Sequence, residues 1–313
     1  MIKVQFAHQP VLLKECIRAL NLRPYGYYVD CTLGGAGHSL GILATEPTIN
    51  LIGIDQDPAA IARARHRLVN FGKQVTLVQE NFRHLKKILA DLKISKVNGI
   101  LLDIGVSSFQ LDKAERGFSY QHKARLDMRM DPRNPLDAWT VVNTYNQEEL
   151  ARILLEYGEE KWAARISKFI VHQRAGASID TTEDLVTVIK KAVPIGARTG
   201  GPHPARRTFQ AIRIAVNDEL GALREVLEQA VQVLDSQGRL LVISFHSLED
   251  RLVKKYFQEL EGKCICPPGL PVCSCGQEAV ARTLTSKPIV ASAEERERNP
   301  RSRSAKLRVA EKL

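Results

Sequence analysis

A glycine-rich segment between two acidic residues is the first feature of this sequence whose residue types and spacing could do chemistry. Asp30 ends one short apolar run and Asp55 ends the next. A glycine turn between a strand and a helix lets backbone N–H groups approach a nucleotide-like ligand, and an acid at the end of the second strand suits two ribose hydroxyls. A purely structural tight turn is the alternative interpretation. The turn consists of Gly34, Gly35, Ala36, Gly37 and His38.

The acid at the end of the second run is better placed for a ligand than for helix capping. Asp57 stands directly before Pro58, the usual order for a helix N-cap followed by its first residue. We therefore expect Asp57 to cap the next helix, which leaves Asp55 free for a ligand.

A third acid, Asp103, ends a further apolar run and is followed by Gly105, Ser107 and Ser108. In an open parallel sheet, ligands bind at the carboxyl ends of the strands, so this carboxylate is expected beside the glycine turn. It could pair with a cationic amino acid group or accept a proton. His246, after a later apolar run, is another candidate proton acceptor, although Ser247 to Asp250 is also a helix-capping pattern.

The elements that must position these residues form an α/β pattern. Short aliphatic runs at 27–30, 51–55, 75–78, 100–103 and 239–245 predict buried strands. Helical stretches at 37–44, 58–71 and 82–92 separate the first four runs. Strands that alternate with helices predict parallel pairing through right-handed crossovers. The fold class is therefore α/β.

The long gap before the fifth strand predicts an inserted helical subdomain, because an ordinary crossover repeat takes roughly 30 residues. Asn146 and Thr181 are expected to cap helices in it, and a helix at 217–234 returns the chain to the sheet. We expect a first part of the main domain at 1–108, the insertion at 109–213 and a second part at 214–313.

The composition excludes several protein classes. With 313 residues, 44% hydrophobic and 26% charged, the chain is neither disordered nor collagen-like. Its apolar stretches are shorter than the 18 or so residues of a spanning helix, and residues 1–15 lack the apolar core of a secretory signal. We expect a cytoplasmic protein that does not contact a membrane.

The net charge of +10 favours a polyanionic partner, RNA or DNA, over a solvated basic surface. The surplus is concentrated at 282–313 and in the acid-free segment 192–217. The candidate phosphate-binding residues in these two segments are Arg206, Arg207, Arg213, Arg301 and Arg303.

Four of the six cysteines lie close together near the C-terminus. A cytosolic protein is not expected to form disulfides, so four clustered thiolates predict either a structural zinc site or reduced thiols in a proline-rich loop. The four are Cys264, Cys266, Cys273 and Cys275.

Several motifs together resemble one known family, the ribosomal RNA small subunit methyltransferase H family of class I, Rossmann-like methyltransferases. They are the glycine run, HQPVLLKE at 8–15, LDIGVSSFQL at 102–111, LDMRMD at 126–131, RTFQAIR at 207–213, ISFHSLEDR at 243–251 and ERNPRSRS at 297–304. The likeness extends nearly from end to end. It implies S-adenosylmethionine-dependent methylation of the N4 atom of a cytidine in the decoding region of 16S rRNA, with the RNA or the small ribosomal subunit as partner.

The resemblance also implies roles for individual residues. It assigns S-adenosylmethionine to the glycine turn, Asp55, Phe82, Asp103 and Gln110, and it implies an inserted helical domain. Cys31 and Ala36 depart from the glycines that relatives often carry. A methyltransferase of the same fold with a small-molecule substrate and a non-catalytic RNA-binding protein are the alternatives.

Methylation of a cytosine amine also requires an acceptor for one of its protons. DNA N4-cytosine methyltransferases commonly carry Asp or Ser before Pro-Pro and an aromatic residue, and this sequence has no such tetrapeptide. Asp103, Ser107, Ser108 and His246 are the available substitutes.

Overall fold

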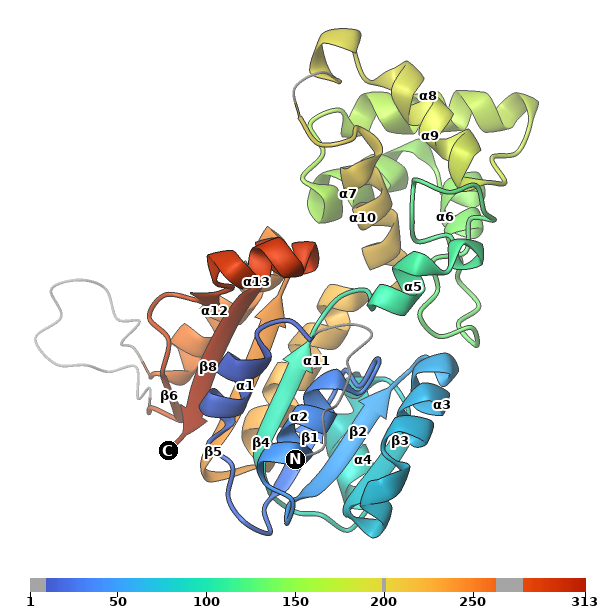
Figure 1. Cartoon of the computed structure of the whole chain (residues 1–313). Coiled ribbons are helices and arrows are strands. Elements are labelled where there is room, and N and C mark those ends of the chain that lie inside the picture. Colours follow the sequence, from blue (N-terminus) through green and yellow to red (C-terminus); the bar gives the residue numbers. More distant parts are fainter. Residues whose placement is uncertain (1–9, 199–200, 263–277) are drawn as a thin grey trace, which may run out of the picture. The chain divides into compact units, whose positions relative to one another are not determined.

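The computed structural model describes residues 10–198, 201–262 and 278–313 (Figure 1). The chain divides into two compact units. Val106–Leu220 forms one of them, which we call the insertion; the segments before and after it form the other, which we call the sheet unit. The predicted insertion, 109–213, lies within the bounds of the first unit.

One eight-stranded sheet organises the sheet unit, with the strand order β3-β2-β1-β4-β5-β8-β6 and with β7 also paired to β8. Pairing is parallel from β3 to β5 and antiparallel wherever β8 takes part. The predicted α/β class and the parallel pairing are thus confirmed. The strands are β1 (Tyr27–Asp30), β2 (Asn50–Asp55), β3 (Val75–Gln79), β4 (Val97–Asp103), β5 (Leu234–Ser244), β6 (Ala281–Thr283), β7 (Ile289–Val290) and β8 (Lys306–Lys312).

Helices cover both faces of this sheet (Figure 1). The helices α1 (Leu13–Leu20), α2 (Gly37–Thr45) and α3 (Pro58–Arg67) contribute buried side chains to one apolar cluster. A second cluster, on the other face, contains residues of α4 (Leu85–Asp91), α11 (Glu219–Val233) and α12 (Ser247–Leu260). Burial on both faces explains why the parallel strands are continuous apolar runs rather than alternating ones.

Some predicted element bounds are wrong for local reasons. The helix expected at 58–71 ends at Arg67 and continues as a 3-10 segment, η1 (Val69–Gln74), in which Gly72 has a φ of 52°. The helix expected at 82–92 begins as a 3-10 turn, η2 (Phe82–His84), before α4. The return helix begins at Glu219 rather than at 217, because Asp218 adopts a left-handed conformation after α10.

The insertion is helical, as predicted. Asn146 and Thr181 cap α7 and α9 through reciprocal capping boxes, which confirms both expected caps. The elements are α5 (Ser108–Asp112), η3 (Ala114–Arg116), α6 (Ala138–Thr144), α7 (Gln147–Gly158), α8 (Ala163–Gly176), α9 (Thr182–Ala192), η4 (Ile195–Ala197) and α10 (Ala205–Asn217). In the described part of the chain, every helix is too short or too polar to cross a membrane.

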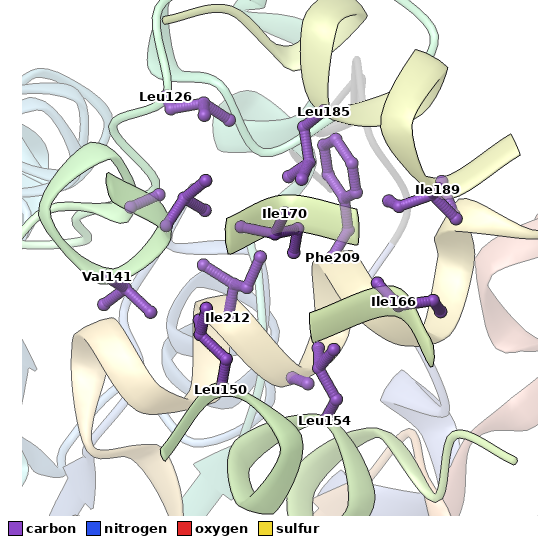
Figure 2. Packing of buried hydrophobic residues seen from close by; sticks show 14 of the residues in the cluster. Leu126, Val141, Leu150, Leu154, Ile166, Ile170, Leu185, Ile189, Phe209 and Ile212 are labelled. Carbon is purple, nitrogen blue, oxygen red and sulfur yellow. The ribbon is translucent and has the colours of Figure 1, made fainter. Parts of the chain in front are cut away.

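The insertion has a hydrophobic core of its own (Figure 2). Ile170 of α8 lies fully buried at the centre of the view, with Ile212 of α10 beside it and Leu185 of α9 above. A unit with its own core can hold its shape independently of the sheet that precedes and follows it in the chain.

The segment after α12 returns to the sheet, which sequence patterning did not predict. It forms β6, β7, α13 (Ala293–Arg298), η5 (Pro300–Ser304) and β8, and β8 pairs with β5 along its length from Arg239↔Glu311 to Ser244↔Lys306. The basic segment at 282–313, expected to attract a polyanion, therefore also has a structural role.

Removing the central side chain of the insertion core is expected to destabilise the insertion. Ile170→Ala should lower its free energy of unfolding by about 2–5 kcal/mol, because the lost contacts leave a cavity. Both tryptophans of the chain, Trp139 and Trp162, lie in the insertion, so tryptophan fluorescence during urea unfolding measures this unit. Lys168→Ala, an exposed position on the same helix, should change the value by less than about 0.5 kcal/mol. Equal effects of the two substitutions would contradict the burial of Ile170.

Candidate functional site

The glycine turn follows β1 and opens α2 at the carboxyl edge of the sheet. Gly34 and Ala36 both adopt left-handed conformations, with φ values of 47° and 57°. Gly37, the first residue of α2, has no room for a side chain, because a Cβ there would lie 2.4 Å from Cγ of Pro10. Glycine at this position is therefore required by the packing of Pro10 against the turn, and the approach of its backbone N–H groups to a ligand stays a prediction.

Asp55, at the end of β2, is already hydrogen-bonded. Its Oδ2 atom accepts from the Gly34 N–H at 2.8 Å and its Oδ1 atom accepts from the Asp57 N–H at 2.9 Å. Asp55 was expected to have no partner in the protein, and these two hydrogen bonds show that expectation to be wrong. The expected helix cap is confirmed, because Asp57 accepts from the Ala59 N–H at the start of α3. Asp55 thus fixes the glycine turn against the end of β2. Each carboxylate oxygen has a second lone pair that can still accept from a ligand hydroxyl.

A fully buried acid, to which the sequence analysis gave no role, forms hydrogen bonds with residues on both sides of the glycine turn. Asp30 at the end of β1 is 1% exposed and accepts from the Ser39 hydroxyl at 2.7 Å and from the Thr32 N–H at 3.2 Å. The Thr32 hydroxyl in turn accepts from the Asp103 N–H at 2.6 Å. The signal that could have found Asp30 was its place at a strand end, a position it shares with the two acids that were chosen.

Asp103, at the end of β4, has an unsatisfied oxygen. Its Oδ1 atom is buried and has no hydrogen-bond partner among the described residues. Its Oδ2 atom lies 3.6 Å from Nδ1 of His38. The other ring nitrogen of His38, Nε2, donates to the Val11 carbonyl at 2.9 Å, so Nδ1 is the atom that this histidine presents to the acid.

The surroundings of Asp103 disfavour its charge. Burial raises the pKa of its carboxyl to about 6; Asp30 and Glu249 add to the increase, and His38 opposes it. Burial likewise raises the pKa of Asp55 to about 6, against the two N–H groups that lower it. A buried carboxylate with an unpaired oxygen at a strand end is the arrangement expected of a site for a cationic ligand.

His246 follows β5, the strand next to β4, and is held near a buried acid. Its Nε2 atom lies 3.0 Å from Oε1 of Glu249, and both ring nitrogens are buried without a hydrogen bond to a described residue. Glu249 is 2% exposed and its other oxygen accepts from the N–H groups of Phe245 and His246. The capping interpretation is confirmed at the start of α12, whereas a role of His246 as a proton acceptor stays a prediction.

Phe82, Ser107 and Gln110 complete the predicted set. Phe82, in η2 beyond β3, is half-buried against the apolar cluster of its sheet face. Ser107 and Gln110 lie in the insertion and form a capping box: the Ser107 hydroxyl accepts from the Gln110 N–H at 3.3 Å, and the Gln110 side chain accepts from the Ser107 N–H at 3.0 Å. The expectation that the Ser107 hydroxyl is available as a catalytic group is therefore weakened.

The predicted phosphate-binding arginines divide into paired and exposed ones. Arg213 is wrong as a phosphate contact, because its guanidinium is held by both oxygens of Glu219 at 2.8 and 2.9 Å. Arg206, Arg207 and Arg303 are exposed, and Arg207 also donates to the Glu159 carbonyl at 3.0 Å. Arg301 is half-buried in η5.

Much of the predicted basic tail is neutralised inside the sheet unit. Lys306 and Arg308 of β8 both pair with Asp250, and Glu311 of β8 pairs with Arg239 and Arg282. The positive charge that remains at the end of the chain is smaller than composition suggested. The cysteine cluster, Cys264, Cys266, Cys273 and Cys275, lies outside the described residues, so the zinc site stays a prediction.

A strand-end site of this kind occurs in many nucleotide-binding folds, so comparison with known proteins decides the family. The model of one family, described as the MraW methylase family, matches residues 5–313. The chain belongs to the MraW methylase family. The resemblance inferred from the sequence motifs is thereby confirmed.

Relatives of this MraW methylase are similar over their whole lengths. A protein of Brevibacillus brevis named ribosomal RNA small subunit methyltransferase H is 54% identical over 315 residues, covering 100% of both chains. The protein of the same name from Heliobacterium mobile is 55% identical over 312 residues, covering 99% of this chain and all of the relative. One from Clostridioides difficile is 53% identical over 311 residues, with the same coverage.

Neutralising Asp103 is expected to stabilise this MraW methylase near neutral pH. The pKa of about 6 exceeds the ordinary value of 3.8, so this acid favours folding below pH 4 and loses that contribution as the pH rises through 6. At pH 8, Asp103→Asn should raise the free energy of unfolding by about 1–3 kcal/mol, because no charge is then buried. The measurement is urea unfolding at pH 8 and at pH 4.

The matched control is Asp91→Asn on α4, where the acid is 63% exposed and pairs with Lys87. It should lower stability by less than about 0.5 kcal/mol. A gain for Asp103→Asn that is as large at pH 4 as at pH 8 would contradict a cost that comes from the buried charge.

Proposed function

We propose that this MraW methylase transfers a methyl group from S-adenosylmethionine to the exocyclic N4 atom of a cytidine in the decoding region of 16S rRNA. The observation that carries the proposal is the identity of more than half of the residues, over full length, with proteins named ribosomal RNA small subunit methyltransferase H. The unsatisfied acid at the sheet edge supports the same reaction independently.

The residues of the sheet unit fit the cofactor. Asp103 offers a buried, unpaired oxygen to the positive amino acid end, and Asp55 retains acceptor capacity for the ribose hydroxyls. The glycine turn, from Gly34 to His38, is the segment whose backbone would contact the cofactor, and the half-buried Phe82 ring can cover the adenine. Gln110, in the insertion, is a further contact that the resemblance implies.

S-adenosylmethionine, when bound, supplies a methyl group already activated by its sulfonium. The protein must then hold the cytosine amine in line with that methyl group and accept a proton from it. Alignment is the larger requirement, because the lone pair of the amine is delocalised into the ring. The side chains at the ends of β4 and β5 are placed to meet both needs.

His246 is the proton acceptor that the geometry favours. The carboxylate of Glu249, 3.0 Å from Nε2, favours a proton on that nitrogen and leaves the lone pair of Nδ1 as the acceptor. The Nδ1 atom has no competing partner within the described ranges of the chain. Asp103, ionised above pH 6, holds positive charge nearby rather than taking the proton.

We further propose that the insertion recognises RNA and that the reaction takes place in the cytoplasm on 16S rRNA or the small subunit. A cytosine must leave its stack to reach a strand-end site, which is easiest in irregular or single-stranded RNA. Arg206 in the insertion and Arg303 in the sheet unit are exposed cations that can contact phosphates. Arg207 and Arg301 can assist them.

Incubation of the purified protein with labelled S-adenosylmethionine and small ribosomal subunits, followed by nucleoside analysis, tests the proposal. N4-methylcytidine is the expected product. Asp103→Asn should weaken cofactor binding, measured by calorimetry, by about 10- to 100-fold, as for loss of one charged contact. Unmodified cytidine after incubation with the wild-type protein would refute the function, and unchanged cofactor affinity in Asp103→Asn would refute the assignment of that acid.

Removal of the proposed proton acceptor should lower kcat and leave the affinity for S-adenosylmethionine unchanged. His246→Ala is expected to lower kcat by about 10²–10⁴ while the Kd for S-adenosylmethionine stays the same. Glu249→Gln should lower kcat less and displace the pH dependence of kcat. His84→Ala, an exposed histidine of η2, is the control and should leave turnover unchanged. A kcat within twofold of wild type for His246→Ala would assign proton removal to another group or to water.

A further inference from the structure

The outer face of α3 and η1 is a basic surface that the proposed function does not yet use. Residues 58–79 contain no aspartate or glutamate. They form α3, η1 and the edge strand β3 of the sheet unit. Their basic residues are Arg63, Arg65, His66, Arg67 and Lys73.

Helix periodicity separates the two sides of α3. Ile61, Ala64 and Leu68 are buried in the apolar cluster beneath the helix. Arg65, His66 and Lys73 are exposed on the outside, together with Val69, which is 68% exposed, and Asn70. We call these five outward residues the α3 surface.

The cations of the α3 surface lack the acidic partners found elsewhere in the sheet unit. The side chains of Arg65, His66 and Lys73 form no hydrogen bond or ion pair with any described residue. By contrast, Lys87 pairs with Asp91 on α4, and Lys255 pairs with Glu259 on α12. The helix dipole favours Arg65 and His66 in the last turn of α3, but it does not account for Lys73 or for the absence of any acid.

This surface adjoins the cofactor turn. Arg67, on the same last turn of α3, donates through Nη1 to the carbonyl of Gly35. The outward cations are therefore attached to an element that touches the turn proposed to hold S-adenosylmethionine. A polyanion that follows α3 would lie beside the reaction site.

The distribution of charge between the two units also favours binding of a polyanion to the sheet unit. The insertion, residues 106–220, has 17 Lys and Arg against 15 Asp and Glu, whereas the rest of the chain has 28 against 20. The sheet unit therefore carries most of the attraction for a polyanion. Phosphate contacts of this type supply affinity that depends on salt and not on sequence.

We propose that the α3 surface binds the sugar–phosphate backbone of the substrate RNA, with Arg65 and Lys73 as phosphate contacts and Val69 against a ribose. This inference rests on the proposed function, because it takes RNA as the substrate. It adds a third contact region to the insertion and to the arginines of η5, which also belong to the sheet unit.

The test compares two double variants that remove the same charge. Arg65→Gln/Lys73→Gln neutralises the α3 surface, and Lys254→Gln/Lys255→Gln neutralises two exposed lysines of α12 on the other face of the sheet. The Kd of each protein for 16S rRNA and for small subunits is measured by filter binding at several salt concentrations. Methylation kinetics, cofactor calorimetry and thermal unfolding are measured in parallel.

Loss of two phosphate contacts should raise the Kd for RNA and the KM for subunits roughly three- to tenfold at moderate salt, with kcat and cofactor affinity unchanged. The slope of log Kd against log salt should fall by about two. The α12 variant should match wild type.

Equal behaviour of the two double variants in RNA binding would overturn the proposal. So would a loss of affinity for subunits alone with binding of naked RNA unchanged, since that result assigns the surface to a ribosomal protein. A failure of the proposed function can be told apart from a failure of this inference. In the first case the wild-type protein makes no N4-methylcytidine, and filter binding still compares the RNA affinity of the two double variants.

Discussion

The packing of three acidic side chains, one fully buried and two half-buried, at the carboxyl ends of β1, β2 and β4 is the constraint on which the rest of the sheet unit depends. A buried carboxylate is costly unless hydrogen bonds or a cation compensate it. Asp30 is compensated by Ser39 and Thr32, and Asp55 by two backbone N–H groups. Asp103 is compensated least, since one of its oxygens has no partner in the described structure. The glycine turn is shaped by these bonds, and the remaining deficit is what a cationic ligand can relieve.

A second set of charged side chains holds the added antiparallel strands onto the sheet. Asp250 and Glu311 each accept two basic side chains across the antiparallel addition of β8 and β6. The lysines and arginines of that region therefore contribute to architecture as well as to electrostatic attraction. The insertion needs no such support, because its helices enclose an apolar core made entirely of their own residues. The two units are thus stabilised differently, one with charge pairs across its added strands and the other with a core of its own.

Sequence reasoning found the parallel strands and the helix caps, because aliphatic runs and residues such as Asp57, Asn146 and Thr181 carry local signals. It placed Asp55 and Asp103 at strand ends, which the structure confirms, but it could not tell that Asp55 already accepts from Gly34, since that bond joins the end of β2 to the turn after β1. The antiparallel strand β8 was not predicted, because its charged residues Lys306 and Arg308 resemble those of a solvated segment when their partner Asp250 is not known. That pairing joins charges far apart in the chain, and it is not encoded in any local pattern. Arg213 was misassigned although its partner, Glu219, lies only six residues further on.

The position of β8 beside β5 also has a consequence for how the chain acquires its structure during synthesis. The insertion is one continuous stretch, so all of its core residues are available before β5 has been made. The sheet unit is discontinuous, and β5 remains an open edge until β8 emerges from the ribosome and covers it. Vectorial synthesis therefore favours early closure of the helical unit and late completion of the sheet, with the pairing of β5 and β8 among the last to form.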